Sequence, residues 1–111
     1  MDLQSDPIEV SDETESAIRE YHTNGASVIR GILDQKWIST MREAIQRVLD
    51  HPGSASVEYT PKGEEGRYYG DFFLWRRDFD FEEFKRHSPL PEFAAKILKS
   101  NNIRFFYDQL L

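Results

Sequence analysis

Cysteine is absent from this 111-residue sequence, and its absence excludes several classes of protein. Without thiols the chain can form no disulfide scaffold, no thiolate zinc site and no cysteine nucleophile. Long hydrophobic runs are absent as well, since none approaches the roughly 20 apolar residues that a membrane-spanning helix needs. Residues 1–6 lack the charged and apolar regions of a signal peptide. We therefore expect a cytoplasmic protein without a membrane span.

Basic residues are in the minority: 14 Lys and Arg stand against 20 Asp and Glu, which gives a formal net charge of −6. Broad contact with a phosphate backbone needs a basic surface, so nucleic acid is not an expected partner. Hydrophobic residues make up 39% of the chain and aromatic residues 14%, more than a disordered chain carries. We expect one globular domain or a part of one.

Apolar periodicity and capping residues predict two helices in the first half of the chain. Asp12 and Glu15 have the spacing of a capping box, so we expect a short helix over residues 12–24. Apolar residues recur at helical spacing over residues 37–49, which predicts a longer helix with Asp34 as its N-cap.

Two further helical segments are expected in the second half. Aromatic residues set among acidic ones predict a helical turn over residues 79–84. Ser88 followed by Pro89 and Pro91 predicts the start of another helix, because proline is accepted in a first turn. Residues 1–11, by contrast, show no apolar period and are expected to form a flexible N-terminal arm.

Runs of β-branched and aromatic residues predict three strands: residues 26–30, 71–75 and 103–111. Residues 54–70 contain proline, glycine and charged residues without a period, and they are expected to form a long loop. Helices and strands thus follow one another in an order that predicts the α+β class.

The last run, residues 105–111, places Tyr107 and Gln109 on one face of a strand together with Phe105 and Leu111. Both faces are largely apolar, so we expect both to be covered. An apolar strand with no turn residues after it also predicts the N-terminal part of a larger fold, cut within a sheet. A strand exposed in this way favours self-association.

Three segments resemble the N-terminal part of the phytanoyl-CoA dioxygenase family, whose members are non-haem Fe(II), 2-oxoglutarate-dependent oxygenases. These segments are YHTNGASVIRGIL (residues 21–33), SPLPEFAA (residues 88–95) and FFYDQLL (residues 105–111). In this family a strand similar to Y-D-Q-L-L leads into an H-x-D metal motif. The resemblance implies that residues 12–111 place helices on the first strands of a double-stranded β-helix, or jelly roll, truncated before the metal motif.

The resemblance implies that the intact enzyme uses Fe(II) and oxygen to convert 2-oxoglutarate to succinate and to hydroxylate a small or lipid-like substrate. The metal motif is missing here, because the residues two places after His22, His51 and His87 are Asn, Gly and Pro. The second histidine and the 2-oxoglutarate-binding arginine of the family lie further towards the C-terminus than residue 111. We therefore expect this chain alone to bind neither cofactor and to contain no catalytic residue.

The resemblance also implies cofactor-binding positions in the intact enzyme. Gln109 matches a position that faces the 2-oxoglutarate pocket in relatives, where an amide can donate a hydrogen bond to a carboxylate. Tyr107 is a second candidate on the same face. Trp75 and Arg76 lie near the place where relatives have pocket residues on the preceding strand.

Several alternatives remain open at this point. The basic and aromatic residues around Trp75 favour a core with solvated charges over a platform for single-stranded nucleic acid, because acidic residues such as Asp71 surround them. Asp108 fits an edge strand or a pocket equally well. The alternative function is a complete, non-catalytic α+β protein-interaction module, which should tolerate Leu110→Asp, whereas a truncated chain should self-associate.

Overall fold

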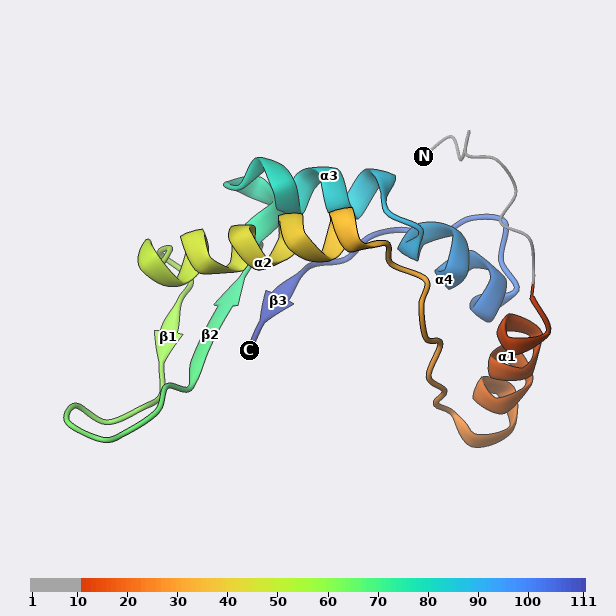
Figure 1. The fold of residues 1–111 in the computed structure, drawn as a ribbon, viewed down its shortest axis with the longest axis horizontal. Coiled ribbons are helices and arrows are strands. Elements are labelled where there is room, and N and C mark those ends of the chain that lie inside the picture. The colour runs from red at the N-terminus through yellow and green to blue at the C-terminus, as the bar shows by residue number, and fades with distance from the viewer. Residues whose placement is uncertain (1–10) are drawn as a thin grey trace. The chain divides into compact units, whose positions relative to one another are not determined.

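The computed structural model describes residues 11–111, whereas residues 1–10 of the predicted flexible arm lie outside the described part. Two packing units comprise, respectively, residues 11–34 with 89–104 and residues 35–88 with 105–111. The described part contains four helices, one 3₁₀ turn and a three-stranded sheet, which together give the predicted α+β class (Figure 1). None of these helices has the length and apolar character needed to cross a membrane.

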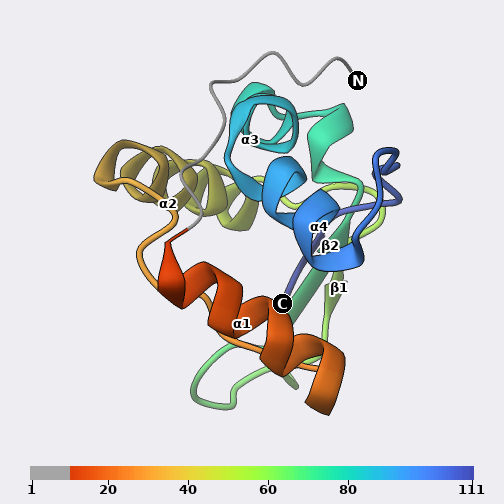
Figure 2. The same cartoon turned by 90° about the vertical axis from the view of Figure 1, so that its right-hand side faces the viewer.

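Helices α1 (Asp12–Asn24) and α4 (Leu90–Leu98) contact each other in the first unit (Figure 2). The Nε2 atom of His22 lies 2.8 Å from the carbonyl oxygen of Ile97, so a hydrogen bond joins the last turn of α1 to the end of α4. Helix α1 ends at Gly25, whose φ of 80° suits a residue without a side chain. The predicted end of this helix is confirmed.

The start of α1 differs from the prediction. Ser11 is the N-cap, because its side chain accepts a hydrogen bond of 3.2 Å from the backbone N–H of Thr14. Asp12 is instead the first helical residue, where its negative charge interacts favourably with the helix dipole. The predicted capping box of Asp12 and Glu15 is therefore wrong, and Ser11 belongs to the helix cap and not to the arm.

Residues 26–30, which were predicted to form a strand, have no strand conformation in the first unit. The side chain of Val28 is 67% exposed. A β-branched run forms a stable strand only where a neighbouring strand supplies ladder bonds and packing. The described part of this unit has no strand, so the local preference finds no partner.

The second unit contains an antiparallel sheet with the strand order β1 (Val57–Glu58), β2 (Tyr69–Phe72) and β3 (Gln109–Leu110). The predicted loop over residues 54–70 thus contains one strand and the beginning of the next. The predicted strand over residues 71–75 starts two residues earlier and ends where Phe73 turns into the left-handed region at φ 57°. A 3₁₀ turn, η1 (Leu74–Arg76), follows. The predicted strand over residues 103–111 is confined to β3.

Helices α2 (Gln35–Asp50) and α3 (Phe79–His87) pack against each other in this unit (Figure 1). The rings of Trp37 and Phe84 meet edge to face, with centroids 5.5 Å apart. Helix α2 confirms the helix predicted over residues 37–49. The apolar period of that segment is the cause, because it gives the helix one face to bury.

The core of the second unit joins α2, the sheet and η1. Val48, Tyr69 and Leu74 form its centre and are at most 4% exposed. Burying one such large side chain contributes on the order of 1.5–3 kcal/mol. Three partly buried side chains pack around this centre: Leu49, Phe81 and Leu110.

Candidate functional site

The strand register assigns the side chains of the sheet to two faces. Residues directly opposite each other in an antiparallel ladder project to the same face. Asp71 is opposite Leu110, and Glu58 is opposite Tyr69. Because Tyr69 and Leu110 pack with Val48 of α2, we call this side of the sheet the covered face.

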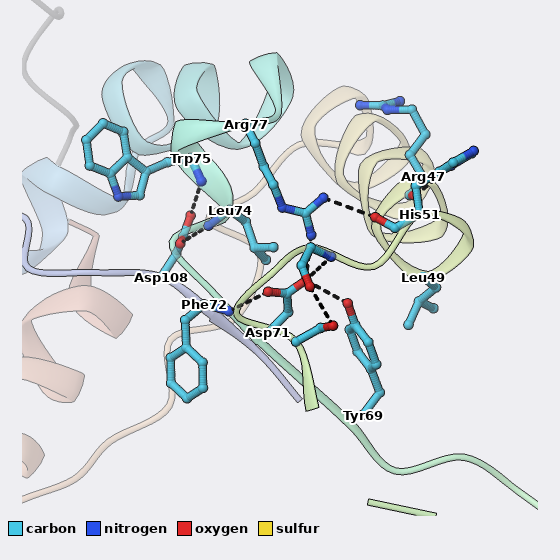
Figure 3. A network of polar contacts seen from close by, with 12 residues as sticks. Arg47, Leu49, His51, Tyr69, Asp71, Phe72, Leu74, Trp75, Arg77 and Asp108 are labelled. Atoms are coloured by element: carbon cyan, nitrogen blue, oxygen red, sulfur yellow. Dashed lines mark hydrogen bonds and ion pairs between the residues drawn. The ribbon is translucent and has the colours of Figure 1, made fainter. Parts of the chain in front are cut away.

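A buried carboxylate organises the covered face (Figure 3). Asp71 is 0% exposed and accepts hydrogen bonds from the Tyr69 hydroxyl at 2.6 Å, from Arg77 Nη2 at 2.5 Å and from the Phe72 backbone N–H at 2.9 Å. Arg77 also donates to the His51 carbonyl oxygen at 3.2 Å. Burying a carboxylate without partners is very unfavourable, so these bonds are required for the fold.

The network changes the acidity of both of its acidic groups. Burial alone raises the pKa of Asp71, but hydrogen bonds from Tyr69, Phe72, Gly53 and Arg77 outweigh burial and hold this pKa below its ordinary value. Burial and the neighbouring carboxylate raise the pKa of Tyr69. Asp71 is therefore an ionised structural group, and the prediction that it is a solvated surface charge is wrong.

A second carboxylate, that of Asp108, caps η1 (Figure 3). Its Oδ1 accepts from the backbone N–H of Leu74 at 2.6 Å, and its Oδ2 accepts from the backbone N–H of Trp75 at 2.9 Å. The Asp108 carbonyl oxygen also accepts from the Phe73 N–H at 3.1 Å. Asp108 thus fixes the turn, and its carboxylate is occupied by backbone donors.

Gly70 lies at the centre of the opposite side of the sheet, which we call the open face. Its ladder partner is Val57. A Cβ atom at Gly70 would lie 3.1 Å from Cε2 of Tyr59 and 3.6 Å from Cδ2 of Leu111, so both side chains lie over this glycine. Tyr59 is 49% exposed and Leu111 is 68% exposed. The open face therefore presents apolar side chains to solvent.

Phe72 extends the open face towards β3. It is opposite Gln109 in the ladder, and its ring centroid lies 6.0 Å from that of Tyr107. Tyr107 and Gln109 thus lie on the same side of the sheet, as strand alternation predicts. The open face as a whole consists of Val57, Tyr59, Gly70, Phe72, Tyr107, Gln109 and Leu111.

The expectation that both faces of the last strand are covered is wrong. Tyr107 is 40% exposed and Leu111 is 68% exposed. Phe105, which was predicted to share their face, packs edge to face on Trp75 with centroids 6.3 Å apart. The alternation fails at Phe105 because the ladder extends over only two residues of this segment.

Trp75 and Arg76 lie on η1 and not on a strand, in contrast to the prediction. The Lys85 ammonium group lies 3.6 Å from the Trp75 ring centroid. The Arg76 guanidinium lies 4.9 Å from the Phe73 ring centroid, and this ring lies 6.1 Å from that of Tyr107. Phe73 therefore lies between the predicted pocket residues of η1 and those of the open face.

The described residues do not fit an iron centre. Within residues 11–111 no group of three or more His, Cys, Asp or Glu side chains could hold a metal ion. His22, His51 and His87 lie at the ends of α1, α2 and α3, which is where sequence analysis expected them to lie. No reaction step through iron can be built from these side chains.

Comparison of the chain with protein-family models, with curated proteins and with solved structures gave no match. The arrangement itself offers one kind of chemistry. Tyr107 and Gln109 present a hydroxyl and an amide within an otherwise apolar, partly exposed surface. Such a surface can hold an apolar body and donate a small number of hydrogen bonds to it.

Proposed function

We propose that this chain forms part of the scaffold of a non-haem Fe(II), 2-oxoglutarate-dependent dioxygenase that resembles the phytanoyl-CoA dioxygenase family. The intact enzyme would act on a small or lipid-like substrate. The observation that supports this proposal is the asymmetry of the sheet. One face is buried against α2, whereas the other is aromatic, partly exposed and carries the two predicted cofactor-binding residues of β3 and its preceding segment.

This asymmetry is what a jelly-roll sheet requires. In packed β-sheets, one face of each sheet contributes to the interior and the other faces outwards. We propose that the open face lines the interior of such a jelly roll and that α2 covers its outer side. Gly70 suits this place, because a glycine inside a strand allows other groups to approach the backbone closely.

We propose that Gln109 and Tyr107 take part in holding 2-oxoglutarate. An amide N–H and a phenolic O–H can both donate to a carboxylate. The open face carries no cationic side chain among its seven residues, so it offers these donors without a charge partner for the cofactor. We therefore propose that the iron ligands and the 2-oxoglutarate-binding arginine come from sequence outside residues 11–111.

The coding DNA past the codon for Leu111 provides the first test. The proposal expects an H-x-D motif within a short distance, followed later by a second histidine and an arginine. An immediate native stop codon would exclude this iron chemistry for the chain and overturn the proposal.

The product of the longer reading frame provides the second test. With Fe(II), oxygen and substrate, we expect it to form succinate from 2-oxoglutarate, and we expect Gln109→Leu to raise the KM for 2-oxoglutarate several-fold. Gln46→Leu is the matched control, because Gln46 lies on α2 and bonds only to Asp50 at 2.9 Å. Equal KM values for both variants would remove Gln109 from the cofactor site.

A non-catalytic protein-interaction module is the second candidate, and one observation favours it. Phe106 is 85% exposed and Leu111 is 68% exposed, beside the free edge of β3. An exposed edge with apolar side chains can add a strand from another chain. Under this alternative the same surface would also support self-association of the 111-residue chain.

Leu111→Asp tests this candidate better than Leu110→Asp. Leu110 packs against the core on the covered face, so its replacement is destabilising under either function. Leu111→Asp leaves the core intact and should abolish self-association in sedimentation velocity, with Glu83→Gln on α3 as the control. A wild-type chain that remains monomeric up to high concentration would argue against association through this edge.

A further inference from the structure

A shallow depression of about 530 Å³ lies beside η1 and the start of α3, apart from the seven residues of the open face. It is lined by Trp75, Arg76, Arg77, Asp78, Phe79 and Glu82. This volume falls in the range that small-molecule sites occupy. Its charges and apolar groups indicate what it can bind.

Both acidic residues of the depression already have cationic partners. Asp78 lies 3.2 Å from Arg47. Glu82 lies 3.0 Å from Lys85 and forms a second ion pair with Arg86. These partners lower the pKa of Glu82, so it stays ionised and paired. The carboxylates of the depression therefore do not need a cation from a ligand.

The two arginines of the depression differ in the same respect. Arg77 is paired with the buried Asp71 at 2.5 Å. Arg76 forms no ion pair with any carboxylate within residues 11–111, although the chain carries an excess of acidic residues. Arg76 is thus a cationic group of the depression that is available to an anion.

The Arg76 guanidinium is held in place by aromatic rings. It lies 4.9 Å from the Phe73 ring centroid and 5.2 Å from the Trp75 ring centroid. Stacking of this kind fixes the planar group and leaves its N–H edges free for a carboxylate, which an arginine can bind through two parallel hydrogen bonds. The buried indole N–H of Trp75 also has no acceptor in the described part of the chain.

Phe79 supplies an apolar wall, since its side chain is 75% exposed at the first position of α3. Asp78 already accepts from the backbone N–H groups of Asp80 and Phe81, so the helix end is capped and Arg76 remains the anion-binding group. We propose that this depression binds a carboxylate ligand that carries an apolar ring. Arg76 binds the carboxylate and Phe79 contacts the ring.

The proposal goes beyond the dioxygenase scaffold and does not depend on it, because 2-oxoglutarate has no apolar ring. The probe is 3-phenylpropionate, titrated into the ¹⁵N-labelled 111-residue chain. Trp75 reports on the site through its indole N–H signal, which is distinguished from that of Trp37 by a Trp37→Phe variant. We expect a saturable shift of the Trp75 signal that weakens as salt is added.

Arg76→Gln should weaken binding of the probe at least tenfold, and Phe79→Ala should weaken it several-fold. Arg42→Gln is the matched control, because Arg42 is exposed on α2 and removes the same charge elsewhere on this unit. Its affinity should stay within twofold of the wild type. Neutral 3-phenylpropionamide should bind at least tenfold more weakly than the acid.

Three results would overturn the proposal. They are the absence of a saturable Trp75 shift in the wild type, equal binding of the acid and the amide, and unchanged affinity in both Arg76→Gln and Phe79→Ala. Dispersed amide spectra establish that each variant is folded. Because Phe79 is largely exposed, its variant keeps the test informative if Arg76→Gln loses its structure.

Discussion

The two faces of the small sheet use different chemistry within a few residues of sequence. On the covered face, the ionised Asp71 is fully buried and is satisfied by hydroxyl, guanidinium and backbone donors. On the open face, Gly70 and Phe72 alternate with it and meet uncharged side chains. The comparison shows that stability is concentrated on the first face, which leaves the second face free to be shaped by a ligand or partner.

Removal of Asp71 should break this comparison most strongly. Asp71→Ala leaves Arg77 and the Tyr69 hydroxyl without their acceptor, and we expect it to lower the free energy of unfolding by about 3 kcal/mol. This is the lower end of the range for buried pairs, because Arg77 is 34% exposed. Urea denaturation measures the loss.

Glu58→Ala is the matched control for that experiment. The pair of Glu58 and Arg67 is 44% and 43% exposed, so its loss should change the free energy of unfolding by less than about 1 kcal/mol. Equal effects of the two substitutions would contradict the structural role assigned to Asp71.

Acidification should remove part of the same contribution. The folded-state pKa of Asp71 lies below its unfolded value of about 3.9. Its contribution to stability is therefore complete above about pH 4 and is lost as the pH falls through the folded-state pKa. We expect the free energy of unfolding of the wild type to fall more steeply below pH 4 than that of Asp71→Asn. Parallel curves would show that Asp71 does not titrate with folding.

Gly53→Ala should have a smaller effect on the same network. An added Cβ would lie 2.7 Å from Nε of Arg77 and would displace the guanidinium from Asp71. We expect a loss of about 1–2 kcal/mol in the free energy of unfolding. In an Asp71→Ala background the loss should shrink, because the ion pair is already absent. A cost that stays the same would place the clash elsewhere.

Gln109→Leu should have the smallest effect on the isolated chain. Gln109 is exposed on the open face, and substitutions at such positions usually change the free energy of unfolding by less than about 0.5 kcal/mol. Thermal and urea unfolding should therefore be nearly unchanged. A loss above 1.5 kcal/mol would show that the open face is packed within the chain itself.

The helices could be predicted from the sequence because their signals are local. Over residues 37–49 the apolar residues recur every turn, and the observed helix differs by two residues at the start and one at the end. Residues 12–24 match α1, although Ser11 supplies its cap. Strands depend on distant partners, and so residues 26–30 carry the right composition without forming one.

The candidate site could be predicted only in part for the same reason. The side-chain alternation that puts Tyr107 and Gln109 on one face depends on neighbouring residues alone. The position of Trp75 depends on Phe73, whose left-handed conformation ends β2 and redirects the chain. The burial of Asp71 was not predictable, because its partner Arg77 is brought back by η1 and lies among other charges in the sequence.

The cap of η1 by Asp108 has a consequence for synthesis on the ribosome. The backbone donors at Leu74 and Trp75 wait for a carboxylate 34 and 33 residues later in the chain. In between, residues 89–104 leave for the first unit, where α1 in turn waits for α4. Neither unit can be completed by local contacts as the chain emerges. High contact order of this kind slows folding, so both units should form late and nearly together.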